Sequence, residues 1–166
     1  MKRILLFLFF TCSVYAYDLY ILPDDYDEVI YLLSKKIESA KEEISLITDE
    51  LDNYKIKRAL VNAAKKGVKI LFISANNTQK NQLALYKNIQ TKDIHAIEDA
   101  KRKGSVSMSV FIIDNSLTCK LSTSLTYLHM RHDIALFSCT HRADTVKSMS
   151  KMMEVFEKRS SNYLKY

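Results

Sequence analysis

The strongest constraint on the fold is an alternation of apolar runs and helical patterns in the first half of the 166-residue chain. Short apolar runs at 18–23, 43–48 and 68–74 are typical of strands. Between them, apolar residues recur every three or four positions, which predicts two helices with one buried stripe each. These stripes are Tyr26, Val29, Leu33, Ile37 and Ala40 in the first helix and Ile56, Ala59, Leu60 and Ala63 in the second. Strands that alternate with helices favour the α/β class, with a parallel or mixed sheet and helices on both faces.

Local signals mark the ends of these two helices. Asp25 and Glu28 have the spacing of a capping box, which predicts that the first helix begins there. Gly67 predicts the end of the second helix, because glycine readily adopts the left-handed backbone that often closes a helix.

The second half of the chain has shorter elements. We expect a helix over 78–89 and strands over 94–98, 103–114, 117–121 and 133–139. A closing helix is expected over 143–158, with an apolar stripe formed by Val146, Met149, Met153 and Phe156. No linker divides the sequence, so we predict one domain over residues 17–166.

The first sixteen residues have the pattern of a secretory signal peptide. Lys2 and Arg3 precede a short apolar run, and the small residues Val14 and Ala16 favour cleavage after Ala16. One alternative is a transmembrane anchor, although the apolar run is shorter than the ~20 residues that span a bilayer. Another is a lipoprotein signal that ends at Cys12. We therefore expect residues 1–16 to be removed and the mature protein to be secreted or periplasmic.

Charge is distributed unevenly along the expected mature chain. Residues 17–53 carry a formal net charge of −8, whereas residues 54–166 carry +12. A basic surface of this kind attracts nucleic acid or anionic lipid head groups. The alternative is an ordinary basic protein whose charged faces contact only solvent.

An alternating stretch, "KGSVSMSVFIID", raises the question of a functional strand at 103–114. Strand side chains point alternately to opposite faces, so Ser105, Ser107 and Ser109 share one side. Val106, Met108 and Val110 would form the other side, which predicts one dry face. Three cationic residues, Lys101, Arg102 and Lys103, come immediately before this strand and are candidates for binding phosphate groups.

Cysteines and histidines give weaker signals. Cys119 and Cys139 remain after the expected cleavage, and either a disulfide or two free thiols fits the sequence. His129 and His132 would share one face of a helix, where one of them could act as a base for Ser107 or Ser122; surface histidines are the alternative. The other two are His95 and His141. No cysteine or histidine spacing typical of a metal site is present.

The phrase "IKRALVNAAKKGVKILFIS", followed further along the chain by "VFIID", resembles the phospholipase D superfamily. The closer resemblance is to its small secreted branch of single-domain, endonuclease-like members. This resemblance implies a phospholipase D-like mixed β-sheet with helices on both faces. It also implies phosphodiester ligands and chemistry that needs no metal or cofactor.

The resemblance further implies a site made from two copies of one motif. That motif is His-x-Lys, four further residues and Asp, followed by a Gly-Ser-x-Asn turn. Two motifs meet across a dimer or pseudo-dimer: one His attacks phosphorus, the other His protonates the leaving oxygen, and Lys and Asn hold the phosphate oxygens.

This chain departs from the motif at its catalytic positions. With Asp114 as the motif Asp, Ser107 stands in place of the His and Ser109 in place of the Lys. In the turn, Ser122 is kept and Ser124 stands in place of the Asn. A serine hydroxyl without a base is a weaker nucleophile than imidazole and supplies no positive charge. We therefore expect a strand that keeps the geometry of the fold and has lost its chemistry, with Asp114 alternatively serving only to cap the following turn.

Three functions follow from these observations. The first is a catalytically degenerate domain that binds nucleic acid or anionic lipid head groups. The second is an active phosphodiesterase or endonuclease with a non-standard nucleophile. The third is an inactive subunit that pairs with an active homologue in a heterodimer, or with its own copy in a homodimer.

Overall fold

The computed structural model describes residues 19–75, 80–94 and 106–162. Within this part of the chain, eight strands form one sheet in the order β1-β7-β6-β5-β2-β3-β4-β8. The strands are β1 (Leu19–Leu22), β2 (Glu43–Thr48), β3 (Lys69–Ser74), β4 (Ile89–Ile94), β5 (Ser109–Ile113), β6 (Leu117–Leu121), β7 (Ala135–Thr140) and β8 (Ser160–Asn162). The helices are α1 (Tyr26–Glu38), α2 (Tyr54–Lys65), α3 (Lys80–Ala84), α4 (Tyr127–His132) and α5 (Ala143–Lys158).

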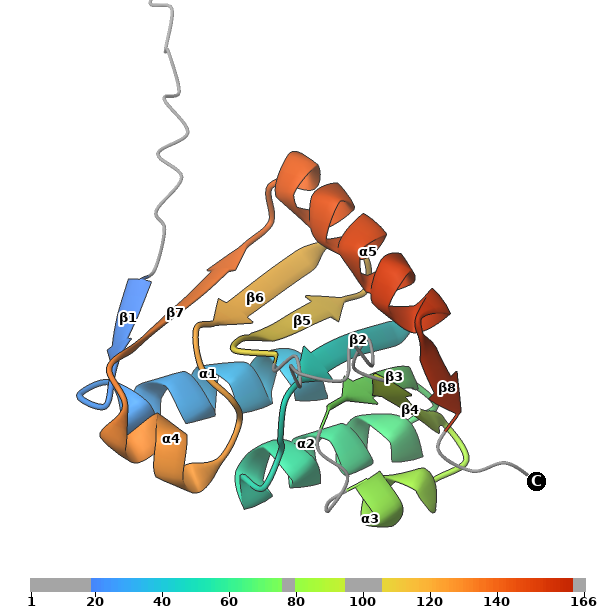
Figure 1. Cartoon of the computed structure of the whole chain (residues 1–166), viewed down its shortest axis with the longest axis horizontal. Helices are drawn as coiled ribbons and strands as arrows, with labels where there is room; N and C mark the ends of the chain where they lie inside the picture. Colours follow the sequence, from blue (N-terminus) through green and yellow to red (C-terminus); the bar gives the residue numbers. More distant parts are fainter. Residues whose placement is uncertain (1–18, 76–79, 95–105, 163–166) are drawn as a thin grey trace, which may run out of the picture.

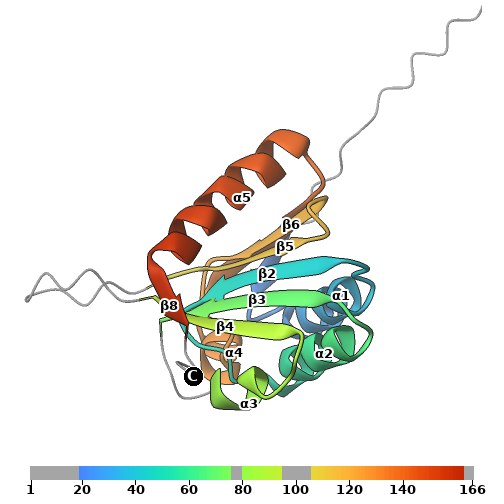
Figure 2. The same cartoon turned by 90° about the vertical axis from the view of Figure 1, so that its right-hand side faces the viewer.

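The sheet is mixed, as the sequence predicts. Strands β2, β3 and β4 are parallel neighbours, and the other pairs are antiparallel. Figure 1 shows β1 and β7 at one side of the sheet and β4 and β8 at the other. Figure 2 shows α5 on one face and α1, α2 and α3 on the opposite face. The α/β class with helices on both faces is therefore confirmed.

Each face of the sheet has its own apolar core. The predicted stripes of α1 and α2 are buried on one face, where they meet the large side chains Phe72, Phe111 and Phe137. On the other face, Val146 and Met153 of α5 pack against β2, β3 and β5, whose contributions are Ile47, Ile73, Val110 and Ile112. Strand β5 is buried on both faces because it lies between these two layers.

The serine-rich strand is shorter than the sequence predicts. It begins at Ser109, and the described residues before it, 106–108, have no strand structure. The prediction of one dry face is also wrong, because Met108 is 47% exposed while Ser109 is fully buried. The first positions of the predicted strand, 103–105, lie outside the described residues.

The segment between β3 and β5 differs from the prediction. The expected helix over 78–89 is limited in the structure to Lys80–Ala84. Strand β4 then begins at Ile89 and pairs in parallel with β3. Its polar sequence has a weak strand propensity, so the strand depends on this pairing. The expected strand over 94–98 lies outside the described residues except for Ile94, the last residue of β4.

The two helix-end signals have different outcomes. Gly67 has φ +97°, which confirms the left-handed residue expected after α2. Asp25 is the N-cap residue of α1, but its side chain makes no capping hydrogen bond. Its carboxylate instead accepts a hydrogen bond of 2.8 Å from the backbone N–H of Ile21. The predicted capping box is therefore wrong, although the helix begins at the predicted position.

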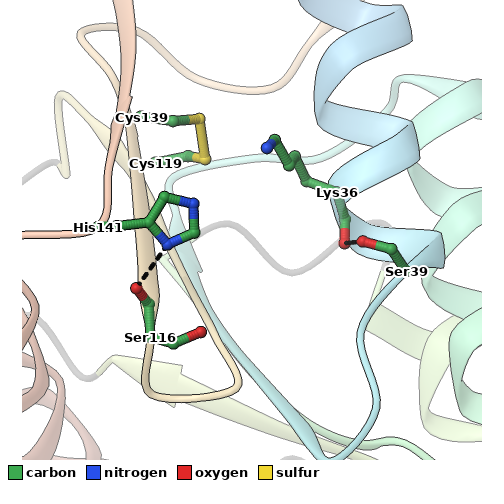
Figure 3. The surroundings of a disulfide bond; sticks show 6 residues. All are labelled: Lys36, Ser39, Ser116, Cys119, Cys139 and His141. Atoms are coloured by element: carbon green, nitrogen blue, oxygen red, sulfur yellow. Dashed lines mark hydrogen bonds between the residues drawn. A yellow bond between two sulfur atoms is a disulfide. The ribbon is translucent and has the colours of Figure 1, made fainter. Parts of the chain in front are cut away.

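Cys119 and Cys139 form a disulfide bond between two neighbouring strands. They are directly opposite each other in the β6–β7 ladder, with their Cα atoms 4.0 Å apart. Figure 3 shows the two sulfur atoms on the side of these strands where Lys36 of α1 lies. Of the two alternatives that the sequence allows, a disulfide or two free thiols, the structure thus contains the disulfide.

The expected signal peptide, residues 1–16, lies outside the described residues. Across the described ranges, no helix is both long and apolar enough to cross a membrane.

Candidate functional site

The predicted motif positions are divided between the two edges of the sheet at which the strands begin and end. At one edge, β2 and β3 end and β5 begins, and three buried hydroxyl residues meet the core there: Thr48, Ser74 and Ser109. We call this the motif edge. Strand β5 ends at the other edge, beside Asp114. Because the five residues of β5 span roughly 17 Å, Ser109 and Asp114 cannot act on one ligand atom.

Ser109, at the predicted motif Lys position, is fixed by a buried hydroxyl cluster. Its Oγ lies 2.8 Å from Oγ1 of Thr48 and 2.8 Å from the carbonyl oxygen of Thr123. The Thr48 Oγ1 also lies 3.1 Å from the carbonyl oxygen of Glu50. Ser109 and Thr48 each have one hydroxyl proton to donate, and three acceptor contacts are within reach. Both protons are therefore donated within the cluster. Ser109 is therefore neither a cation nor an accessible nucleophile.

Ser107, at the predicted motif His position, has a different environment. It is exposed and precedes the first residue of β5. Among the residues that the structure describes, none forms a hydrogen bond with its side chain. No base among the described residues is therefore hydrogen-bonded to the Ser107 hydroxyl, as activation of a serine nucleophile requires.

Asp114 has a structural role at the opposite edge. Its carboxylate accepts hydrogen bonds of 2.9 to 3.2 Å from the backbone N–H groups of Lys41, Glu42 and Glu43. Burial alone raises the pKa of Asp114, but the hydrogen bonds from these amides outweigh it and hold the pKa below the ordinary value of 3.8. Asp114 and Asn115 have φ of 50° and 48°, a left-handed conformation that Asp and Asn tolerate well. The side chain thus joins the β5–β6 turn to the start of β2.

The motif turn after β6 is held in place by backbone contacts. Ser122 is exposed, and its Oγ accepts a hydrogen bond of 2.8 Å from the N–H of Leu136. Ser124 is buried in the same turn. Leu125 pairs with Leu51, so this turn is linked to the loop that follows β2. Of the turn serines, only Ser122 is exposed to a ligand from solvent.

The histidines do not complete a catalytic pair. His129 and His132 are exposed on α4, as the helical spacing predicts, and Nδ1 of His129 lies 2.7 Å from Oδ2 of Asp133. Nδ1 of His141 lies 3.0 Å from the carbonyl oxygen of Ser116, as Figure 3 shows. His95 lies outside the described residues. No described histidine forms a hydrogen bond with Ser107 or Ser122.

The predicted cationic segment and a possible metal site are the remaining features to consider. Lys101, Arg102 and Lys103 lie outside the described residues. Within the described ranges, no group of three or more His, Cys, Asp or Glu side chains is arranged to hold a metal ion.

Sequence reasoning missed Thr48 and Thr123 as partners of Ser109. Thr48 is the last residue of the buried strand 43–48, and a hydroxyl at that place is the only local signal of a polar contact. Its partner is 61 residues away in the sequence. The pairing depends on β2 and β5 being neighbours in the sheet.

Comparison with known proteins shows which fold this arrangement belongs to. No protein-family model and no curated protein sequence matches the chain. Solved structures do match: NucT from Helicobacter pylori has a TM-score of 0.81 at 18% identity, with 89% of this chain and 99% of that chain covered. Nuc from Salmonella typhimurium, a phospholipase D family member, has a TM-score of 0.68 at 18% identity, with 90% and 99% covered.

A third match is a DNA-binding protein. TrmBL2, an archaeal chromatin protein with a novel mode of DNA binding, has a TM-score of 0.61 at 12% identity, with 87% of this chain and 55% of that chain covered. Such identities show a shared fold. The chain therefore has the fold of the phospholipase D family, which confirms, for the fold, the resemblance seen in its sequence.

Proposed function

We propose that this protein is a phospholipase D-like domain that binds phosphodiester groups of nucleic acid or phospholipids without cleaving them by the His and Lys chemistry of the superfamily. The observation that supports it is the Ser109 hydroxyl, which is buried against Thr48 at the motif Lys position. This position supplies no charge to hold a phosphate oxygen. The exposed Ser107, at the predicted motif His position, forms no hydrogen bond with a base among the described residues.

Binding is assigned to the motif edge and the cationic segment before it. Lys101, Arg102 and Lys103 precede Ser107 in the sequence, and the exposed Ser122 lies in the motif turn. Cations and hydroxyls are the groups that most often contact a phosphodiester backbone. With the signal peptide removed, the protein would meet such ligands outside the cytoplasm, as a secreted or periplasmic domain.

A salt titration tests this proposal. A labelled oligonucleotide and vesicles with anionic head groups are each titrated with the purified protein at increasing salt. We expect affinity to fall steeply with salt, because contacts to phosphates release counterions. Replacing Lys101, Arg102 and Lys103 together by Ala should weaken binding, and the exposed pair Lys147 and Lys151 on α5 is the control. Unchanged affinity in the triple variant would contradict the assignment to this segment.

A second candidate function, the partner subunit, is favoured by an exposed apolar face. Ile21 of β1 and Leu136 of β7 are directly opposite each other and are 48% and 50% exposed. Leu19 lies on the same face of β1 and is also exposed. Helix α5 packs on β2, β3 and β5 and not on this pair. The face borders Ser122, so a second phospholipase D-like chain bound here would bring two motif turns together.

Light scattering tests the partner role. The wild-type protein should be a dimer or should copurify with a homologous chain that has an intact motif, and Leu136→Asp should separate the subunits. Tyr31→Asp, on the exposed face of α1, is the control and should leave assembly unchanged. A monomer at all concentrations, with no copurifying homologue, would contradict the partner role.

A further inference from the structure

The segment from the N-cap of α2 to Lys92 in β4 contains no acidic residue. Residues 53–92 contain nine Lys or Arg and no Asp or Glu, whereas acidic residues are frequent in the chain before it. Helices α2 and α3 belong to this region and lie on the face of the sheet opposite to α5 (Figure 2). The region therefore presents a positive surface that is separate from the motif edge.

A groove between α2 and α3 concentrates this charge. It has a volume of about 780 Å³, and the residues that line it include three cations, two tyrosines and no carboxylate among those that the structure describes. The cations are Lys57, Arg58 and Lys65. A positive concave surface of this kind raises the local concentration of anionic ligands.

Aromatic and apolar side chains border the same groove. Tyr54 is 70% exposed, and Leu85 on the α3 side is 82% exposed, while Tyr86 is half-buried. Tyr54, Arg58 and Lys65 follow the helical repeat, so they lie along one stripe of α2. Arg58 and Lys65 form no ion pair with any residue of the described ranges. The exposed Tyr54 and these two cations are therefore available to a ligand from solvent.

We propose that the groove between α2 and α3 binds single-stranded nucleic acid. Arg58 and Lys65 would contact successive phosphates, and Tyr54 and Tyr86 would stack on bases. The bases of a single strand can stack on aromatic side chains in a positively charged groove. In a duplex the base faces are already stacked on one another and are not accessible. A concave site with a half-buried tyrosine also fits a polymer strand better than the flat surface of a membrane.

The position of the groove relates it to the motif edge. Tyr54 follows Asn53, and the backbone N–H groups of Asp52 and Asn53 both donate to the carbonyl oxygen of Leu125 in the motif turn. From Tyr54 the groove follows α2, whose twelve residues span about 18 Å. The groove is thus a binding surface beyond the one in the proposed function, and it begins beside it.

Fluorescence anisotropy with a labelled oligothymidylate tests the groove. We expect Arg58→Ala combined with Lys65→Ala to weaken binding at least tenfold and to reduce the salt slope by about 1.4, since each phosphate contact on a single strand contributes about 0.7. The control is Lys147→Ala combined with Lys151→Ala on α5, which removes the same charge from exposed sites on the opposite face. An equal loss in both double variants would overturn the proposal, because the effect would then be one of net charge.

Tyrosine variants separate stacking from charge. Tyr54→Leu should weaken binding about tenfold, whereas Tyr54→Phe should keep it, because phenylalanine retains the aromatic face. No loss with Tyr54→Leu would overturn the stacking assignment. Binding to vesicles of anionic phospholipid that depends on Arg58 and Lys65, without binding to the oligonucleotide, would overturn the assignment to nucleic acid.

The motif-edge variant keeps the two binding proposals distinguishable. Loss of binding only in the Lys101, Arg102 and Lys103 variant would contradict the groove and support the motif edge. Loss only in the Arg58 and Lys65 variant would support the groove and contradict the motif edge.

Discussion

The hydroxyl oxygens of Ser109 and Thr48 lie 2.8 Å apart inside the sheet, between the neighbouring strands β5 and β2. The sequence predicts that Ser109 is at the position where the phospholipase D motif has its lysine. In this chain the position is fully buried, and its hydroxyl makes contacts only within the protein. Ser109 is thus part of a packed polar cluster that connects β5 to β2 and to the turn after β6.

Restoring the motif lysine should destabilise the protein. Ser109→Lys would place an ammonium group in a site filled by hydroxyls and core, with no acidic partner in the cluster. We expect a loss of about 3 kcal/mol or more in the free energy of unfolding, against about 1 kcal/mol for Ser109→Ala. Urea denaturation followed by circular dichroism measures both. A Ser109→Lys protein as stable as wild type would show that the site can hold a cation.

Loss of the disulfide should lower stability without removing the fold. The bond joins Cys119 and Cys139, which are 20 residues apart in the sequence. A crosslink that closes a loop of this length contributes about 3 kcal/mol. We expect Cys119→Ala combined with Cys139→Ala to lower the guanidinium midpoint, and a reductant to do so in the wild type only. An unchanged midpoint in both cases would mean that the bond does not form.

Asp114 should contribute stability that depends on pH. Its lowered folded pKa means that the ionised carboxylate stabilises the fold above its unfolded pKa, and that this contribution is lost as the pH falls through the folded pKa. Asp114→Asn should cost about 1–2 kcal/mol at neutral pH, and the difference from wild type should shrink below pH 3.8. Thermal melts between pH 2 and 7 measure it, with Asp24→Asn, at an exposed residue, as the control. A difference that is constant with pH would contradict the role of the charge.

Asn53 should anchor the loop beside the motif edge. Its Oδ1 accepts hydrogen bonds from the N–H groups of Lys55 and Ile56 at the start of α2, and its Nδ2 donates to the hydroxyl of Tyr26. Asn53→Ala should therefore cost about 1–2 kcal/mol, and Tyr26→Phe should cost less. Urea denaturation of both variants tests this order, and equal losses would contradict the capping role.

Elements with a strong local pattern could be predicted from the sequence. In α1 and α5 the apolar residues repeat with the helical period, and β2 is a short apolar run. Each pattern is complete within its own element. Strand β4 could not be found in this way, because its polar sequence is held by parallel pairing with β3. The strand predicted over 103–114 begins only at Ser109, because alternation alone does not show where a strand enters the core.

The arrangement of the candidate site residues could not be predicted from the sequence. Counting from Asp114 predicts the motif positions, and this assignment stays a prediction; the sequence could not show that Ser109 is buried and Ser107 exposed. That difference depends on Thr48 and Thr123, which are distant from Ser109 in the sequence. Side chains brought together by sheet order leave little local signal.

The most direct test of the central claim is hydrolysis of labelled single- and double-stranded DNA by the purified protein, in the presence of a metal chelator. The Ser107→Ala variant is assayed beside it. We predict that neither protein cleaves, although the wild type binds the same DNA in a salt-sensitive way. Cleavage by the wild type that disappears in Ser107→Ala would contradict the account, because Ser107 would then have taken over a catalytic role.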